Sequence, residues 1–204
     1  MRCAAVLAVL LGLSVVPVRA ADTKEMKTDD EGFIRLWLIL APISLPDGQS
    51  GAEGLDKQQL KDEAKLKPKE GDTAKAGENT LKWTKYEAGE HYIDFNAHLG
   101  NVTEDAVAYA VCYVVADKPY KKTKLKMGSD DQSKVYLNGK QVLKNVENRG
   151  LEKDQDTSDP VELKAGVNVI VFKVINEKAD FSGCLRFVDE QDKPIAGLKV
   201  ALRP

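Results

Sequence analysis

The dipeptide Asn138-Gly139 is the feature that most constrains how this chain of 204 residues folds. It separates two runs of apolar character, residues 134–137 and 141–144. A two-residue type I′ turn needs positive φ at both central positions, which glycine adopts without a Cβ clash and asparagine tolerates better than most residues. The sequence therefore predicts a β-hairpin here, and with it an antiparallel sheet.

Strand signals recur from residue 33 to residue 202, in short apolar or alternating runs separated by Gly, Pro, Asn or Asp. Residues 167–175 are apolar on both parities, which predicts a central strand covered on both faces. Lys173 lies inside that run, and its ammonium must reach solvent or a buried acceptor.

One short helix is predicted over residues 56–67. Asp56 and Gln59 have the spacing of a capping box, good helix formers follow them, and Pro68 ends the segment. Many short strands with one helix predict an all-β fold, a two-sheet antiparallel sandwich.

The first 20 residues have the pattern of a signal peptide. Arg2 precedes an apolar run over residues 4–16 that is too short for a membrane span, and Val18-Arg19-Ala20 places small residues where a signal peptidase reads them. Residues 21–32 are charged and lack apolar periodicity, which predicts a flexible leader. We therefore expect an exported protein with one domain over residues 33–204.

Charge argues against nucleic acid as a partner. Without Arg2 and Arg19 the chain keeps 28 of its 30 basic residues against 32 acidic ones, a net charge of −4. Nucleic-acid binding depends on clustered Lys and Arg that neutralise phosphates. No later apolar run approaches the ~20 residues of a membrane span.

Two cysteines remain after the leader, and both lie within apolar strand sequence. A disulfide between Cys112 and Cys184 is one alternative for an exported protein. Cysteine also packs as a small apolar residue in a core of ordinary size, and we expect this unpaired, buried state.

The run from Gly128 to Val142 resembles the galactose-binding-like jelly-roll domains of secreted bacterial proteins. The resemblance continues through Arg149, Asp154, Asp156 and the segments 161–169, 172–174 and 185–187, and covers roughly residues 33–202. Such domains are similar to the non-catalytic sugar-binding modules attached to glycoside hydrolases. The resemblance implies a jelly-roll sandwich that binds carbohydrate or a cell-surface polymer.

Strand parity predicts where a site lies. If consecutive strands run antiparallel, every second connection falls at one end of the sandwich. The segments 97–105, 128–133, 145–160 and 176–182 then share an end, and Asn138-Gly139 lies at the other. Loops on a rigid sandwich commonly carry binding residues. The candidate ligand-binding residues at this end are Asp130, Asp131, Arg149, Asp154, Asp156 and Phe181.

Several of these residues have structural alternatives. Asp130 and Asp131 have the oxygen chemistry that calcium requires, but no calcium-loop spacing is present, and we favour a turn role. Arg149 either donates to a ligand or forms an ion pair with Asp154 or Asp156 that holds the loop, and we favour the ion pair. Phe181 is, with Trp83 and Tyr86, a candidate exposed platform for a sugar ring, although Trp83 is favoured as core.

The sequence gives little support for catalysis. His91 and His98 are the two histidines, and neither HExxH, GxSxG nor a local Cys-His pairing occurs. The resemblance stated above therefore implies a non-catalytic carbohydrate-binding module. The alternatives are an adhesion or structural protein that binds another protein, and a calcium-dependent lectin similar to the PA14-type domain, whose Asp-Asp before a strand resembles Asp130-Asp131.

Overall fold

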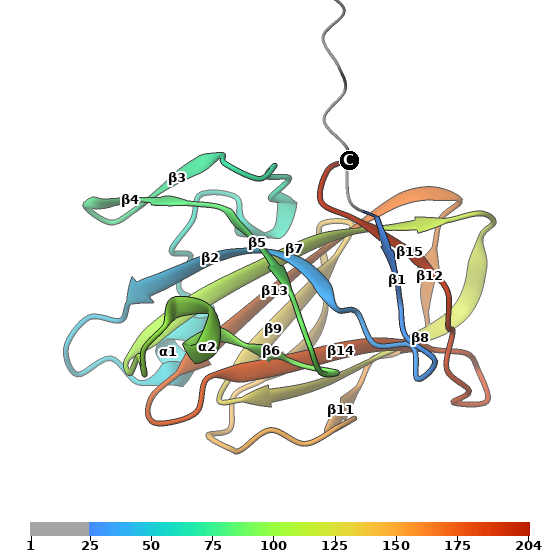
Figure 1. The fold of residues 1–204 in the computed structure, drawn as a ribbon. Helices are drawn as coiled ribbons and strands as arrows, with labels where there is room; N and C mark the ends of the chain where they lie inside the picture. The colour runs from blue at the N-terminus through green and yellow to red at the C-terminus, as the bar shows by residue number, and fades with distance from the viewer. Residues whose placement is uncertain (1–24) are drawn as a thin grey trace, which may run out of the picture.

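The computed structural model describes residues 25–204, so the predicted signal peptide and the first residues of the predicted leader lie outside the described residues. Two antiparallel sheets pack face to face, and a small two-stranded ribbon stands beside them (Figure 1). The predicted all-β antiparallel sandwich is confirmed. Within residues 25–204, no helix is both long and apolar enough to cross a membrane.

The larger sheet has eight strands and is built around the pairing of β7 with β13. These strands pair over their whole length, from Gly166 opposite Ala116 to Asn176 opposite Ala106. The second edge of β13 pairs with β9 of the β9–β10 hairpin, and the second edge of β7 pairs with β15 and β2. The strands are β1 (Met26–Lys27), β2 (Leu36–Ser44), β5 (Thr84–Glu87), β7 (Ala106–Ala116), β9 (Ser133–Leu137), β10 (Lys140–Asn145), β13 (Gly166–Asn176) and β15 (Lys199–Ala201).

The smaller sheet has five strands and is built around β8 and β14, which pair from Ser182 opposite Asp130 to Val188 opposite Lys124. β6 pairs with β14, and β11 and β12 pair with β8. The strands are β6 (Ile93–Asp94), β8 (Tyr120–Asp130), β11 (Asp156–Thr157), β12 (Val161–Leu163) and β14 (Ser182–Val188), and the separate ribbon is β3 (Thr73–Ala76) with β4 (Asn79–Lys82).

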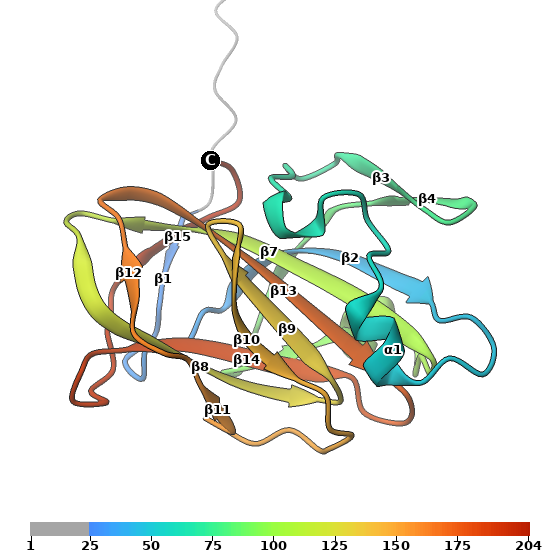
Figure 2. The same cartoon turned by 180° about the vertical axis from the view of Figure 1, so that it is seen from behind.

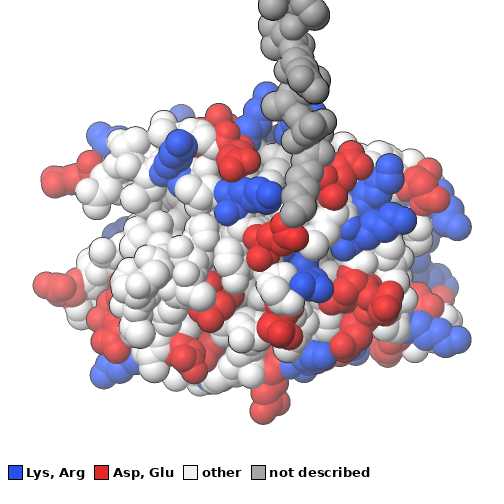
Figure 3. All heavy atoms as spheres, in the orientation of Figure 1, with Lys and Arg blue, Asp and Glu red and all other residues white. Residues whose placement is uncertain are grey.

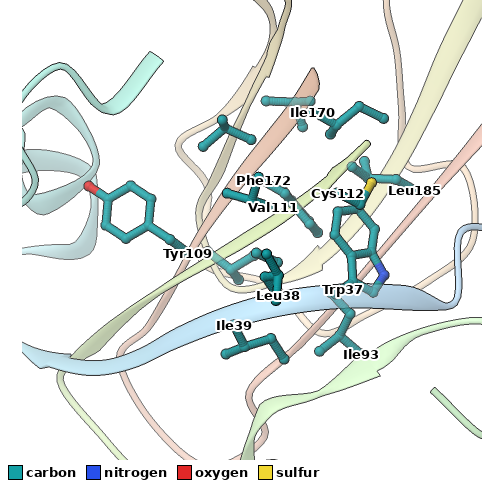
Figure 4. Packing of buried hydrophobic residues seen from close by; sticks show 14 of the residues in the cluster. Trp37, Leu38, Ile39, Ile93, Tyr109, Val111, Cys112, Ile170, Phe172 and Leu185 are labelled. Atoms are coloured by element: carbon teal, nitrogen blue, oxygen red, sulfur yellow. The ribbon is translucent and has the colours of Figure 1, made fainter. Parts of the chain in front are cut away.

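Apolar side chains fill the space between the two sheets. Trp37 of β2 is fully buried and reaches toward Leu185 of the smaller sheet (Figure 4). Its ring centroid lies 6.3 Å from that of Phe172. Cys112 and Cys184 are free and buried, as predicted. Trp83 is buried as well, which confirms its predicted core role.

Residues 50–68 cover the opposite face of the larger sheet, so β13 is buried on both faces as predicted (Figure 2). Lys173 points to this face and has no exposed surface. Its ammonium donates to the carbonyl oxygens of Gly54, Leu55 and Lys57 at 3.1, 3.0 and 2.6 Å. The predicted need of this lysine for a buried acceptor is therefore met by backbone oxygens.

Glu63 supplies the counter-charge for that lysine, 3.3 Å from its ammonium. The hydroxyls of Tyr109 and Tyr136 donate to the two carboxylate oxygens of Glu63, at 2.5 and 2.7 Å. Burial lowers the pKa of Lys173 to about 8, against the opposing effect of the Glu63 carboxylate. Every member of this network has a partner, as buried polar groups require.

The helix of this covering segment begins and ends earlier than the sequence predicts. α1 (Gly51–Asp56) starts at a capping box formed by Ser50 and Glu53, and the predicted helix over residues 56–67 is wrong. Only a 3₁₀ turn, η1 (Glu63–Lys65), lies in that range. The backbone becomes extended at Lys57, and the ammonium groups of Lys134 and Lys173 both donate to the carbonyl oxygen of Leu55 in the last turn of α1.

A second short helix, α2 (Phe95–Leu99), corrects the prediction of a single helix. The Asp94 carboxylate accepts a hydrogen bond from the Ala97 N–H at 2.8 Å, and Gly100 ends the helix at φ 76°. The chain therefore passes from the short strand β6 directly into a helix.

The predicted flexible leader is wrong over residues 25–32. β1 pairs with β15, so Met26 lies opposite Val200. Thr28 is buried, donates to the Ile195 carbonyl at 3.3 Å and accepts from the Leu198 N–H at 3.1 Å. Pairing with the C-terminal segment orders these charged residues despite their lack of apolar periodicity.

The hairpin gives the first test of this fold. Asn138 and Gly139 have φ values of 51° and 83°, as a type I′ turn requires. We expect Gly139→Val to lower the free energy of unfolding by about 1–3 kcal/mol, because a β-branched residue is strained at positive φ. Urea unfolding measures this, with Lys140→Val as the control in the adjacent strand. Equal stability of the two variants would contradict the turn assignment.

The buried network gives the second test. Glu63→Ala should lower the free energy of unfolding by about 3–5 kcal/mol, because it leaves the ammonium of Lys173 buried without a counter-charge. Thermal and urea unfolding measure the loss, with Glu70→Ala as a control that removes the same charge from an exposed position. A loss no larger than that of the control would show that Glu63 does not stabilise Lys173.

Candidate functional site

Several connections of the sandwich meet at one end, as strand parity predicts. The last pairs of β13 with β7 and of β8 with β14 place residues 100–105, 131–132 and 177–181 together. The loop 146–155 joins them, because the Arg149 N–H donates to the Asp131 carboxylate. The turn at Asn138-Gly139 lies at the opposite end, beside Val169 of β13. We call the first group the loop end.

Asp131 organises the loop end. One carboxylate oxygen accepts the Arg149 N–H at 3.2 Å, and the other accepts the Glu177 N–H at 2.8 Å. Its own N–H donates to the Ile175 carbonyl at 2.8 Å. Burial raises the pKa of Asp131, and hydrogen bonds from backbone N–H groups oppose that rise. Asp131 therefore joins two connections that are distant from it in sequence, which is not the local turn role that we favoured from the sequence.

Arg149, Asp156 and Asp154 form ion pairs that hold the loop 146–155. Arg149 pairs with Asp156 and donates to the Ser129 hydroxyl at 3.2 Å. Asp154 pairs with Arg186 of β14 and accepts its Nε–H at 2.8 Å. The favoured ion-pair role of Arg149 is confirmed with Asp156 as its partner, and Asp154 pairs elsewhere.

A cleft of about 970 Å³ opens beside these loops. Asp94, Ser182 and Asp130 form a row across β6, β14 and β8, because Ser182 lies opposite both aspartates in its two pairings. Residues directly opposite in a sheet share a face, so all three side chains face the cleft. The row forms its floor, on the outer face of the smaller sheet.

Two walls rise on either side of this floor. One wall consists of α2 and the residues that flank β6 and α2, among them His91, Tyr92 and Asn101. The loop 146–155 forms the other wall, with Gly150 and Leu151. Figure 3 shows that the surface over α2 is largely uncharged and is bordered mainly by acidic side chains.

The loop 146–155 also closes the sheet face next to the cleft. A Cβ atom at Gly128 would lie 1.9 Å from the Glu152 carbonyl oxygen, so backbone covers the sheet there without any gap. The open part of the outer face is therefore the part at the loop end.

Asp130 is the most perturbed carboxyl group of the cleft. Partial burial, together with the neighbouring charges of Asp131 and Asp180, raises its pKa to about 6, against a hydrogen bond from the Leu151 N–H. Burial lowers the pKa of His91. Its ring packs 5.2 Å from those of Phe33 and Tyr92.

Of the six predicted ligand-binding residues, the structure brings Asp130 and Phe181 to the cleft. Phe181 is only 1% exposed and packs 4.6 Å from Phe95, so its prediction as an exposed platform is wrong. The other four form hydrogen bonds or ion pairs with other groups of the protein: Asp131, Arg149, Asp154 and Asp156. Sequence reasoning did not select the lining residues Tyr92, Asp94, Asn101 and Asp180. Asp180 lies in a segment that parity assigns to this end, but the pairing of Asp94 with Ser182 had no local signal.

Calcium does not fit this arrangement. Both oxygens of Asp131 accept backbone N–H groups, which leaves them poorly placed for a cation. Across residues 25–204, no three His, Cys, Asp or Glu side chains are grouped to hold a metal ion. Calcium takes six to eight oxygen ligands.

Comparisons with known proteins give no family assignment. No family model and no curated protein matches the sequence. Two solved structures are similar over parts of their length. A β-glucosidase from Kluyveromyces marxianus is 9% identical over 57% of this chain and 15% of the enzyme, with a TM-score of 0.33. The GH31 α-xylosidase of Xanthomonas citri is 10% identical over 89% of this chain and 23% of the enzyme, with a TM-score of 0.30. The chain spans less than a quarter of either enzyme, and scores this low do not establish a shared fold.

The loop end gives the third test. Asp131→Ala leaves two backbone N–H groups without acceptors, so we expect a loss of about 2 kcal/mol or more in the free energy of unfolding. Amide signals of residues 146–151 and 177–180 should shift or broaden in NMR spectra. Asp159→Ala, which removes an exposed carboxylate, is the control. Unchanged amide signals in these two segments would contradict the organising role of Asp131.

Proposed function

We propose that this protein is an exported, non-catalytic carbohydrate-binding module of the galactose-binding-like kind, and that it binds sugar in the loop-end cleft. The observation that carries the proposal is the floor of the cleft, the row Asp94, Ser182 and Asp130 beside the ring of Tyr92. Sugar sites combine polar groups that bind hydroxyls with aromatic rings that contact C–H faces. The predicted signal peptide supports export.

The spacing of the row supports a small sugar unit as the ligand. Adjacent strands lie about 4.8 Å apart, so Asp94 and Asp130 are separated by roughly 10 Å between Cα atoms. One pyranose ring with its hydroxyl groups fits that interval. The open cleft between two walls also leaves room for a chain of linked sugars to extend beyond the row.

One observation favours a second candidate function. Asp130, with its pKa raised to about 6, faces the same cleft as Asp94 and Asp180, and glycosidases use a pair of carboxyl groups of which the general acid has a raised pKa. Asp94 is already committed to capping α2, which leaves it one free oxygen and restricts its movement. We therefore place binding ahead of hydrolysis.

A binding experiment tests the proposal. A glycan array identifies bound oligosaccharides, and an NMR titration with a binder should shift amide signals of residues 91–102, 130, 150–151 and 180–182. We expect Tyr92→Ala to weaken binding about tenfold, because the aromatic contact is lost. Tyr120→Ala, a partly buried tyrosine near the opposite end, is the control and should bind normally.

Other outcomes separate the alternatives. Shifts confined to the hairpin end would exclude the loop-end cleft. A folded protein that binds no glycan would reject the carbohydrate proposal and favour a protein partner. Release of reducing sugar that stops in Asp130→Asn would favour the hydrolase.

A further inference from the structure

The loop-end cleft is acidic and has no strong cation in its lining. Asp94, Asp130 and Asp180 face it, and neither lysine nor arginine is among its lining residues. Because burial lowers the pKa of His91, that ring is neutral near pH 7. The charge field of the cleft therefore favours a cation and opposes an anion.

The cations of the neighbouring loop are committed elsewhere. Arg149 pairs with Asp156, and neither residue lines the cleft. Lys153 pairs with Glu31 at 2.9 Å. Neither side chain compensates the carboxylates of the cleft, so that charge is left for a ligand.

The hydrogen-bonding groups of the cleft are mostly acceptors. The amide group of Asn101 uses its N–H donors on the Val102 carbonyl and the Thr103 hydroxyl, at 3.0 and 2.9 Å. The Asn96 side chain donates to the Ala179 carbonyl and accepts from the Thr103 N–H. Both amides therefore hold the wall in place. The Asn101 amide has used both of its N–H groups, and the Asn96 amide keeps one.

What remains for a ligand is an excess of acceptor oxygens. The carboxyl groups of Asp130 and Asp180 line the cleft, with Asp130 accepting one bond from the Leu151 N–H, and Asp94 keeps the oxygen that does not cap α2. The side-chain donors of the lining are fewer: the hydroxyls of Tyr92 and Ser182, one N–H of Asn96 and one ring N–H of His91. A ligand that satisfies this lining must donate more hydrogen bonds than it accepts.

A primary ammonium meets both requirements. It carries a positive charge and three N–H donors, and it has no acceptor. A bound ammonium also relieves the repulsion between Asp130 and its acidic neighbours Asp131 and Asp180. Calcium would neutralise the negative charge of the carboxylates but needs more oxygen ligands than this lining brings together.

We propose that the cleft selects sugars that carry a free amino group, of the glucosamine type, over N-acetylated and carboxylated sugars. This inference rests on the proposed carbohydrate function and names the ligand class of the same site. The N-acetyl group removes the charge and two donors, and a uronate adds a second anion beside the aspartates.

Calorimetric titration with three oligosaccharides of equal length tests the inference, in EDTA and near neutral pH. The probes are oligomers of glucosamine, of N-acetylglucosamine and of galacturonic acid. We expect the glucosamine oligomer to bind at least about tenfold more tightly than its N-acetylated form, the size of a charge-assisted hydrogen bond, and the galacturonate not to bind.

Two variants and a control assign that preference to the cleft. Asp180→Asn and Asp130→Asn should each reduce the preference for the free amine several-fold while binding of the N-acetylated oligomer changes little. Asp180 is exposed, so its variant tests the inference even if Asp130→Asn unfolds. Asp159→Asn removes the same charge outside the cleft and should keep the preference, which excludes a general effect of net charge.

Each remaining outcome has a defined meaning. Equal affinity for the two glucosamine oligomers, or a preference unchanged in Asp180→Asn, would overturn the amine inference and leave the carbohydrate proposal standing. Binding that requires calcium would also overturn it. Failure of the folded protein to bind any sugar would overturn both proposals.

Discussion

The pairing of β7 with β13 is the constraint on which the rest of the structure depends. Both strands are buried on two faces, and their eleven-residue register runs from one end of the sandwich to the other without a break. Every other strand of the larger sheet pairs with one of them directly or through a neighbour. Their shared end, where Asn176 meets Ala106, fixes the height at which the loops leave the sheet. The register of β7 with β13 therefore determines where the loop-end cleft lies.

Polar groups have two different roles on the two sides of this strand pair. On the outer side of the larger sheet, Lys173 and Glu63 are fully buried and every one of their charges is matched by a carbonyl, a hydroxyl or the opposite charge. At the loop end, Asp131 is matched in the same way by backbone N–H groups. Asp130, next to it in sequence, faces open space with an elevated pKa. The fully matched groups hold the fold, and the carboxylates that line the cleft are the ones that we propose meet a ligand.

This division gives a physical basis for the proposed specificity. Loops that are held by internal ion pairs, such as Arg149 with Asp156, keep their shape without a ligand and so lose little entropy when one binds. The same pairs remove the basic side chains from the cleft. A rigid, acceptor-rich and acidic cleft discriminates by charge and by the number of donors, which is the basis of the proposed preference for amino sugars over their N-acetylated forms.

The sequence by itself determined the class of fold, the hairpin at Asn138-Gly139, the central strand 167–175 and the end at which the loops gather. These features depend on local backbone preference and on the period of apolar residues, and both can be recognised within a short segment of sequence. The ends of α1, the order of residues 25–32 and the lining of the cleft depend on partners distant in sequence. Lys173 binds a carbonyl group in the last turn of a helix more than a hundred residues earlier in the chain, and Ser182 brings Asp94 and Asp130 into one row. Only the tertiary structure decided these, because register between distant strands is a property of their packing and not of either strand alone.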